Sequence, residues 1–217
     1  MCPPRRFGGT LFPAPRRSTV VAFGFVRNTA CRTSTSTRHT SGGVVSTVIV
    51  TGGAGFIGSN LADALIADGH TVHVVDDLSH GTREKVPADA VFHQVDIRDQ
   101  AAMAALTRDA DPDVVFHLAA QADVRRAIED PAFDAAVNVA GTLNVLEAAR
   151  AVGAKVVFAS TGGAGYGEYE GLDVPTPESA QTRPLSHYGM SKMAAEGYCG
   201  LYERLYGMHT VVLRLGN

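Results

Sequence analysis

Cysteine is scarce in this sequence, and none of it is spaced for a shared structural task. Cys2, Cys31 and Cys199 are scattered over 217 residues, without a CxxC pair or the His/Cys spacing of a zinc site. We therefore expect no disulfide framework and no metal centre. A reducing, cytoplasmic setting is the default expectation for such a chain. A hydrophobic fraction of 45% is enough for one sizeable core without covalent links.

The sequence also lacks long apolar runs, and its N-terminal part lacks acidic residues. No stretch reaches the length of a membrane span, so we expect no membrane partner. No acidic residue precedes Asp63, although seven arginines lie within residues 1–46. The rest of the chain holds 12 basic against 22 acidic residues. This negative body is a poor candidate for non-specific nucleic-acid binding.

Residues 1–45 form a basic leader that we exclude from the fold. The segment is rich in Arg, Pro, Ser and Thr and has no sustained apolar period, which is typical of chain that does not pack. Arg16 and Arg17 before the short apolar run 20–26 weakly resemble a twin-arginine signal, and the composition also fits a transit peptide. A wrongly assigned translation start is the third interpretation, and all three stay open.

Residues 46–217 alternate between short apolar runs and helical periodicity, which predicts one domain. The alternation favours an α/β fold with a Rossmann-type, doubly wound parallel sheet, whose ligands bind at the carboxyl ends of the strands. We expect helices after residue 56 and over 100–108, 132–152 and 187–206. We expect strands over 46–51, 71–75, 90–95, 114–118, 155–160 and 210–215.

A glycine motif lies between the first predicted strand and the first predicted helix. Gly52, Gly55 and Gly58 form a GxxGxxG pattern. The first two glycines permit a tight turn that brings the backbone close to a diphosphate, and Gly58 lets the helix pack closely on the strand. A glycine cluster alone is often only a turn. Its place in a strand–turn–helix unit favours a dinucleotide site.

Carboxylates follow the second and third predicted strands. Asp76 ends the second strand 18 residues after Gly58, where it can accept hydrogen bonds from both adenosine ribose hydroxyls. Asp76 and Asp77 would repel a 2′-phosphate and thus favour NAD over NADP, although Arg83 is close enough to leave the preference open. Asp96, followed by Ile97, is either a contact to the adenine edge or an ordinary loop carboxylate.

A tyrosine and a lysine supply candidate chemistry. Tyr188 and Lys192 are four residues apart, so on a helix they share one face. A nearby ammonium and a positive nicotinamide ring would favour the phenolate, which could take a proton from a sugar hydroxyl as hydride leaves the same carbon. Such a pair also occurs by chance on exposed helices. Ser160 and Thr161, at the end of the fifth predicted strand, could hold the substrate oxygen or merely end a strand.

Eight sequence blocks resemble those of the extended short-chain dehydrogenase family over residues 46–217. They are TGGAGFIGSNL, VDDLSHG, DIRD, HLAAQADVRRAIEDP, NVAGTLNVLEAA, ASTGGAGYGE, YGMSK and LRLGN. Within this family of NAD-dependent epimerases and dehydratases, the chain is most similar to the 4-epimerases of the UDP-glucose/UDP-galactose type. The resemblance implies a tightly bound NAD that transiently oxidises C4 of a nucleotide sugar, with a UDP-hexose as the substrate. It also implies a homodimer formed through the helices that carry Asn138 and Tyr188.

The resemblance implies a role for each matching residue. Tyr188 would be the acid/base, and Lys192 would hold the nicotinamide ribose and tune Tyr188. Thr161 or Ser160 would bond the sugar oxygen, because the alignment through Gly162-Gly163 is uncertain by one position. Asn217 would contact the UDP-sugar. The cofactor would be held by Gly52, Gly55, Phe56, Ile57 and Gly58 at the diphosphate, Asp76, Asp77, Leu78 and Ser79 at the adenosine ribose, Asp96 and Ile97 at the adenine, and Leu118, Ala119, Ala120 and Asn138 on the nicotinamide side.

Departures from the family pattern limit the interpretation. Sugar-nucleotide 4,6-dehydratases follow the catalytic Thr with an acidic residue, whereas residues 162–165 here are GGAG, which favours epimerisation over dehydration. The family pattern continues beyond the LRxxN block, so we expect the substrate lobe to be missing from these residues. The alternatives are another NAD-dependent nucleotide-sugar dehydratase or reductase, or a non-catalytic NAD(P)-binding module.

Overall fold

One parallel sheet forms the centre of the protein, which is described here from a computed structural model covering residues 20–23, 45–168 and 175–216. The strand order in the sheet is β1-β7-β6-β5-β2-β3-β4. The strands are β1 (Val20–Phe23), β2 (Thr47–Thr51), β3 (Thr71–Asp76), β4 (Val91–Gln94), β5 (Val114–His117), β6 (Lys155–Thr161) and β7 (Thr210–Leu215).

The order of the strands reverses at β2. From β2 the chain moves outward to β3 and β4, and it then returns to pair β5 with the opposite edge of β2. Strands β6 and β7 continue outward on that side. In an open parallel sheet, the crevice at such a switch point lies at the carboxyl ends of the strands and is the expected place for a ligand.

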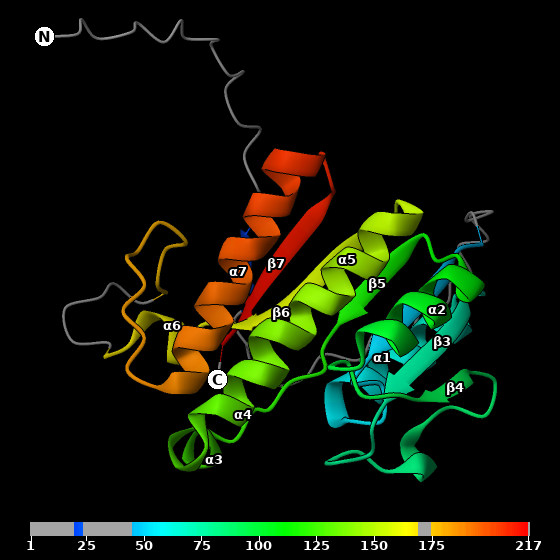
Figure 1. Cartoon of the computed structure of the whole chain (residues 1–217), viewed down its shortest axis with the longest axis horizontal. Helices are drawn as coiled ribbons and strands as arrows, with labels where there is room; N and C mark the ends of the chain where they lie inside the picture. The colour runs from blue at the N-terminus through cyan, green and yellow to red at the C-terminus, as the bar shows by residue number, and fades with distance from the viewer. Residues whose placement is uncertain (1–19, 24–44, 169–174, 217) are drawn as a thin grey trace, which may run out of the picture.

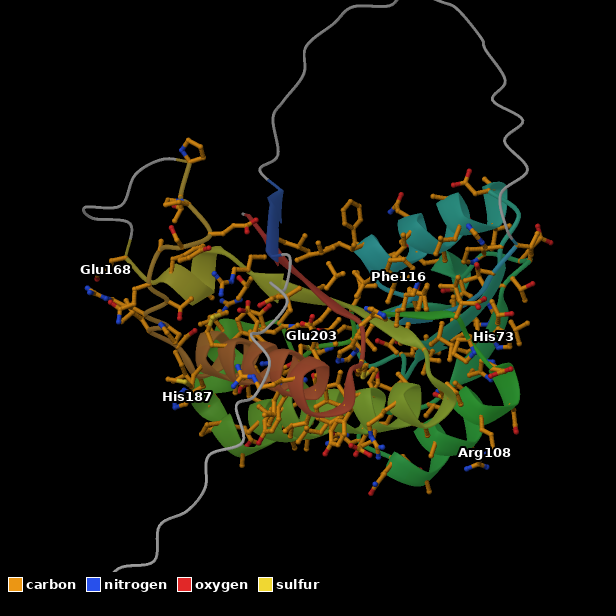
Figure 2. All side chains as sticks on the ribbon, turned by 90° about the horizontal axis from the view of Figure 1, so that it is seen from above. His73, Arg108, Phe116, Glu168, His187 and Glu203 are labelled. Atoms are coloured by element: carbon orange, nitrogen blue, oxygen red, sulfur yellow. The ribbon has the colours of Figure 1, made fainter. Side chains whose placement is uncertain are left out.

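Helices cover both faces of the sheet, and α5 and α7 lie side by side on one of them (Figure 1). Figure 2 shows α1 on the opposite face, where Phe116 also lies. The helices are α1 (Phe56–Ala67), α2 (Gln100–Ala110), α3 (Val124–Glu129), α4 (Pro131–Ala135), α5 (Thr142–Val152), α6 (Gly163–Tyr166) and α7 (His187–Tyr206), with a 3₁₀ turn η1 (Arg83–Lys85) and a π-helical segment η2 (Ala136–Gly141).

Two apolar cores hold these layers together. The larger core packs the sheet against α2, α5 and α7 and includes Ile49, Leu146 and Phe158. The smaller core packs the sheet against α1 and includes Val50 and Val74. Successive residues of one strand, such as Ile49 and Val50, therefore face opposite cores. This explains why the central strands read as continuous apolar runs in the sequence.

Short polar side chains cap most of the helices that begin from loops. Asp99, Asp123, Asp130 and Ser186 accept backbone hydrogen bonds at the starts of α2, α3, α4 and α7. Helix α1 begins after Gly55, which has no side chain to fill this role. The first turn of α1 thus differs from the capped helices, as expected of a helix start that meets an anion.

The predicted fold class is confirmed, and the structure adds elements that the sequence did not indicate. All six predicted strands and all four predicted long helical stretches are present. The stretch 132–152 is divided, however, by the π-helical η2. Helices α3 and α6 are additional. No helix in the described ranges is both long and apolar enough to cross a membrane.

Exclusion of the whole leader from the fold needs correction. Residues Val20–Phe23 form β1, whose backbone pairs in parallel with β7 from Val212 to Leu215. Two adjacent β-branched residues favour an extended backbone, and β7 offers an unpaired edge for it. Leader residues 1–19 and 24–44, including Arg16 and Arg17, lie outside the described residues.

The glycine turn before α1 is packed backbone to backbone. A Cβ atom on Gly58 would lie 2.2 Å from the carbonyl oxygen of Gly52. Gly52 itself has φ +71°, and its Cβ would lie 2.7 Å from the amide nitrogen of Ala119. A side chain at either position therefore forces backbone to move. In contrast, a Cβ on Gly197, exposed on α7, would meet nothing within 4 Å.

We predict opposite effects for alanine at these two kinds of glycine. Gly58→Ala should lower the free energy of unfolding by about 1–3 kcal/mol because the added methyl group overpacks a rigid turn. Gly197→Ala should raise it by about 0.5–1 kcal/mol because alanine loses less backbone entropy in a helix. Urea unfolding of the two variants and the parent chain measures both. A neutral Gly58→Ala variant would contradict the close packing of this turn.

Candidate active site

A cavity of about 350 Å³ lies at the carboxyl ends of β2, β3 and β5. The glycine turn forms one wall, the loop after β3 forms a second, and the segment after β5 forms a third. Its lining residues are Gly52, Gly55, Phe56, Val75, Asp76, Asp77, Ser79, His80, Gly81, Lys85, Val95, Asp96, Ile97, Leu118, Ala119, Ala120 and Val137.

Asp76 ties the glycine turn to the loop that follows β3. One carboxylate oxygen accepts a hydrogen bond from the Ala54 N–H at 3.0 Å, and the other accepts one from the Leu78 N–H at 2.8 Å. Leu78 adopts φ +62°, which is uncommon for a residue with a side chain. Each carboxylate oxygen has a second lone pair, so Asp76 can still accept hydrogen bonds from a ligand hydroxyl.

Asp96 is held by a neighbouring arginine at the rim of the cavity. The Asp96 carboxylate accepts hydrogen bonds from the Arg98 backbone N–H at 2.8 Å and from the Arg98 guanidinium. These bonds keep the pKa of Asp96 below its usual value. Asn144 from α5 donates to the carbonyl oxygens of Ile97 and Arg98 and so fixes the backbone of this loop.

Lys192 is a buried cation anchored on β6. Its side chain is 3% exposed, and its Nζ donates to the Ala159 carbonyl oxygen at 2.9 Å. The Nζ atom lies 4.6 Å from the ring centroid of Phe158 and 6.0 Å from that of Tyr188. Burial lowers the pKa of Lys192 to about 8, although nearby Asp134 and Glu196 act in the opposite direction. The ammonium is therefore poised to lose its proton in a mildly alkaline range.

Two hydroxyl groups end β6 beside this lysine, and they differ in their bonding. Ser160 Oγ is buried and has no hydrogen-bond partner within the described part of the chain. Thr161 Oγ1 accepts the Ala164 N–H at 3.3 Å, which leaves the hydroxyl hydrogen of Thr161 available to donate. Both side chains are at most 5% exposed.

A buried carboxylate connects α4 to the helix that carries Tyr188 and Lys192. Asp134 is fully buried, accepts the Ser191 hydroxyl at 2.6 Å and accepts the Asn138 side-chain amide at 2.9 Å. Asn138 also exchanges two hydrogen bonds with the Gln121 backbone, both 2.9 Å. Asp134 thus joins η2, the segment after β5 and α7 in one polar network.

Burial raises the pKa of Tyr188, and the negative charge of Asp134 raises it further. These two effects oppose the one expected from a nearby ammonium and a positive nicotinamide ring, which would favour the phenolate. The physical reasons are that burial removes the phenolate from water and that the Asp134 carboxylate has the same sign of charge as the phenolate. The phenol form is therefore stabilised in this site.

Comparison with known proteins places these features in a family. A sequence profile of the NAD-dependent epimerase/dehydratase family matches residues 48–217. A putative UDP-glucose 4-epimerase of Methanocaldococcus jannaschii is 44% identical over 171 residues, which is 78% of this chain and 55% of that protein. This chain belongs to the NAD-dependent epimerase/dehydratase family. It spans about half the length of the curated relatives it matches.

Solved structures of this family agree with the fold. The UDP-glucose 4-epimerase of Thermotoga maritima, solved with UDP-glucose, matches with a TM-score of 0.74 and 44% identity over 77% of this chain and 54% of that one. The UDP-glucose 4-epimerase of Thermus thermophilus, solved with NAD, matches with a TM-score of 0.74 and 47% identity over the same shares of the two chains.

Most cofactor residues expected from the family resemblance border the cavity. The others do not line it. Gly58 packs on Gly52, the Leu78 N–H donates to Asp76, and Ile57 is half exposed on α1. Asn138 is buried in the polar network, and its neighbour Val137 reaches the cavity instead. The expected residues that do line the cavity are Gly52, Gly55, Phe56, Asp76, Asp77, Ser79, Asp96, Ile97, Leu118, Ala119 and Ala120.

The expected catalytic residues are not among the residues that line the cavity. Lys192 on α7 donates to Ala159, which directly precedes Ser160 and Thr161 at the end of β6. Its Nζ lies 6.0 Å from the ring centroid of Tyr188. Asn217 lies outside the described residues. No group of three or more His, Cys, Asp or Glu residues in the described ranges is arranged to hold a metal ion.

Sequence patterns did not indicate several residues of the site. His80, Gly81 and Lys85 line the cavity directly after the predicted ribose loop, and their proximity to Asp76 in the chain was the available signal. Asp134 and His117 are buried polar residues. Burial of a polar group follows from tertiary packing, so their residue types alone did not reveal it.

We predict that Asp134→Asn lowers the pKa of Tyr188, because the substitution removes a buried negative charge and keeps the side-chain shape. An NMR titration of protein labelled at the tyrosine Cζ carbon, with Tyr188→Phe used for assignment, measures this pKa. Ser191→Ala is the control: it removes the bond to Asp134 but leaves the charge, so the raised pKa should persist. An unchanged Tyr188 pKa in Asp134→Asn would refute the electrostatic role of Asp134.

Proposed function

We propose that the complete protein is a nucleotide-sugar 4-epimerase of the UDP-glucose type that uses NAD. The observation that carries this proposal is that Lys192, one helical turn after Tyr188 on α7, donates to Ala159 directly before the two hydroxyls that end β6. Residues 162–165, which follow these hydroxyls, contain no carboxylate that could drive loss of water. Epimerisation therefore fits the residues better than dehydration.

The residues present fit a dinucleotide. Gly52 and Gly55 line the cavity with backbone atoms, and α1 begins there without a side-chain cap within the described residues. Asp76 offers free lone pairs for ribose hydroxyls, and Asp76 with Asp77 places negative charge where NADP would carry its extra phosphate. When bound, NAD supplies a reversible acceptor for the hydrogen on the substrate carbon.

The side chains of the chain supply proton transfer and orientation. Tyr188 would take the proton of the C4 hydroxyl and return it after the hydride has been restored to the other face of the sugar. The Lys192 ammonium would stabilise the phenolate at that moment, against the burial that otherwise favours the phenol. Thr161 or Ser160 would donate a hydrogen bond to the sugar oxygen and hold its orientation.

We predict that Tyr188→Phe in the complete gene product lowers kcat for interconversion of UDP-glucose and UDP-galactose by about 10²–10⁴-fold, because a general acid/base is lost. NAD binding should persist, since the aromatic ring is kept. Tyr198→Phe is the matched control on the same helix and should retain activity. A Tyr188→Phe enzyme with normal turnover would reject this assignment. A parent protein that binds NAD but turns over no nucleotide sugar would instead favour a non-catalytic NAD(P)-binding module.

We also propose a cytoplasmic homodimer formed through the helical face of α5 and α7. The two helices lie side by side (Figure 1), and Leu201, Leu205 and Tyr206 on α7 are between 39% and 59% exposed. Large exposed apolar side chains on neighbouring turns are typical of a protein interface. The cytoplasmic setting rests on the sequence, in which no cysteines are spaced for a shared task.

We predict that Leu205→Glu shifts the complete gene product from dimer to monomer, because it places a charge within an apolar contact. Light scattering after size-exclusion chromatography measures the mass. Val91→Glu, at an exposed position on strand β4 at the far end of the sheet, is the control and should leave the mass unchanged. A Leu205→Glu protein that stays dimeric would place the interface elsewhere.

A further inference from the structure

A chain of buried hydrogen bonds crosses the protein behind the cavity. His117, at the end of β5, is 1% exposed. Its Nδ1 lies 2.7 Å from Thr51 Oγ1, at the end of β2, and its Nε2 lies 3.0 Å from Thr142 Oγ1, at the start of α5. The chain extends at both ends, because the Ala119 N–H donates to Thr51 Oγ1 at 3.3 Å and Thr142 Oγ1 donates to the Asn138 carbonyl oxygen at 2.7 Å.

The number of available hydrogens fixes which atom donates in each of these hydrogen bonds. A carbonyl oxygen only accepts, so the single hydroxyl hydrogen of Thr142 is used on Asn138. His117 Nε2 must then donate to Thr142 Oγ1, which makes Nδ1 the acceptor for the Thr51 hydroxyl in a neutral imidazole. The Thr51 oxygen remains free to accept the Ala119 N–H. Every donor and acceptor is matched only when His117 is neutral with its hydrogen on Nε2.

The surroundings of His117 favour this neutral state. Its ring stacks on Phe158 with the centroids 5.6 Å apart, and Lys192 Nζ lies 4.6 Å from the centroid of the same Phe158 ring. Burial first, and the Lys192 charge second, lower the pKa of His117 to about 3. A protonated His117 would turn Nδ1 into a donor and deprive the Thr51 hydroxyl of its acceptor.

Thr51 and His117 precede different walls of the cavity. Thr51 directly precedes Gly52, and His117 directly precedes the segment 118–120. These walls are in contact, since a Cβ on Gly52 would lie 2.7 Å from the Ala119 amide nitrogen and 2.9 Å from the Leu118 carbonyl carbon. The Asn138 carbonyl lies in η2, a π-helical interruption of the kind that often marks a functional site.

We propose that His117 is a positioning residue that sets the spacing between the glycine turn and the segment 118–120, through its Nε2–H tautomer bonded to Thr51 and Thr142. The cavity that it braces is the one assigned to NAD, so the proposal rests in part on the proposed function. Its role is distinct from that of Tyr188 and Lys192, because it reaches a ligand only through the backbone of Gly52 and Ala119.

The tautomer can be tested without any ligand. In ¹⁵N-histidine-labelled protein, with His117→Gln used for assignment, we expect His117 to show a protonated Nε2 and an unprotonated Nδ1 from pH 8 to about pH 5. Thr142→Val, which removes the acceptor of the Nε2–H, should shift the Nε2 resonance, and Thr142→Ser should restore it. An imidazolium at pH 5, or a hydrogen on Nδ1, would overturn the proposal whether or not NAD binds.

The positioning role can be tested by comparing NAD with AMP. Thr51→Val and Thr142→Val should each weaken NAD binding by on the order of three- to tenfold, as expected for one lost buried hydrogen bond. AMP brings one phosphate to the glycine turn but lacks the nicotinamide half expected beside the segment 118–120, so its Kd should change less than that of NAD. Thr51→Ser and Thr142→Ser should restore NAD binding.

Calorimetric titration at a temperature where every variant is folded gives both affinities. Equal weakening of AMP and NAD, or no weakening of either, would overturn the positioning role, because a purely structural brace would not discriminate between the two ligands. If the complete parent protein binds neither ligand, the proposed function fails, and the tautomer measurement still decides the state of His117.

Discussion

Close backbone contact at the glycine turn is the constraint on which the site depends. The turn packs against the segment after β5 at Gly52 and against the first turn of α1 at Gly58, with no room for a Cβ atom at either contact. Because backbone atoms cannot rotate away as side chains do, this contact limits how closely the two cavity walls can approach each other. The parallel pairing of β2 with both β3 and β5 brings those walls together.

Charge compensation is the second requirement of the site. Lys192 and Asp134 are both buried, and each would be costly to bury alone. The negative charge of Asp134 raises the pKa of Tyr188 and also that of Lys192. Hydrogen bonds from Ser191 and Asn138 satisfy the carboxylate, while the Ala159 carbonyl accepts from the ammonium. The chemistry of Tyr188 is thus adjusted by groups that ligands need not touch.

Local sequence patterns were sufficient for the elements that bury apolar side chains at a regular period. Strands such as 114–117 and the helix 187–206 appear close to their predicted bounds, because strand or helix periodicity is a local property. The glycine motif was also readable, since only glycine satisfies the turn between β2 and α1. The edge strand β1 was missed because its pairing depends on the exposed edge of β7, which lies at the opposite end of the sequence.

Polar residues inside the fold were the part that sequence patterns could not assign. His117 ends an apolar strand and Asp134 lies on a short helix, and either could have faced solvent by residue type alone. Their burial arises because β2, β5 and α5 converge on His117, while α4 and α7 converge on Asp134. Each is stable there only because every partner has a matching donor or acceptor. The buried polar groups that the sequence did not predict thus have separate tasks in the site. His117 braces the distance between the cavity walls, and Asp134 supplies negative charge near Tyr188.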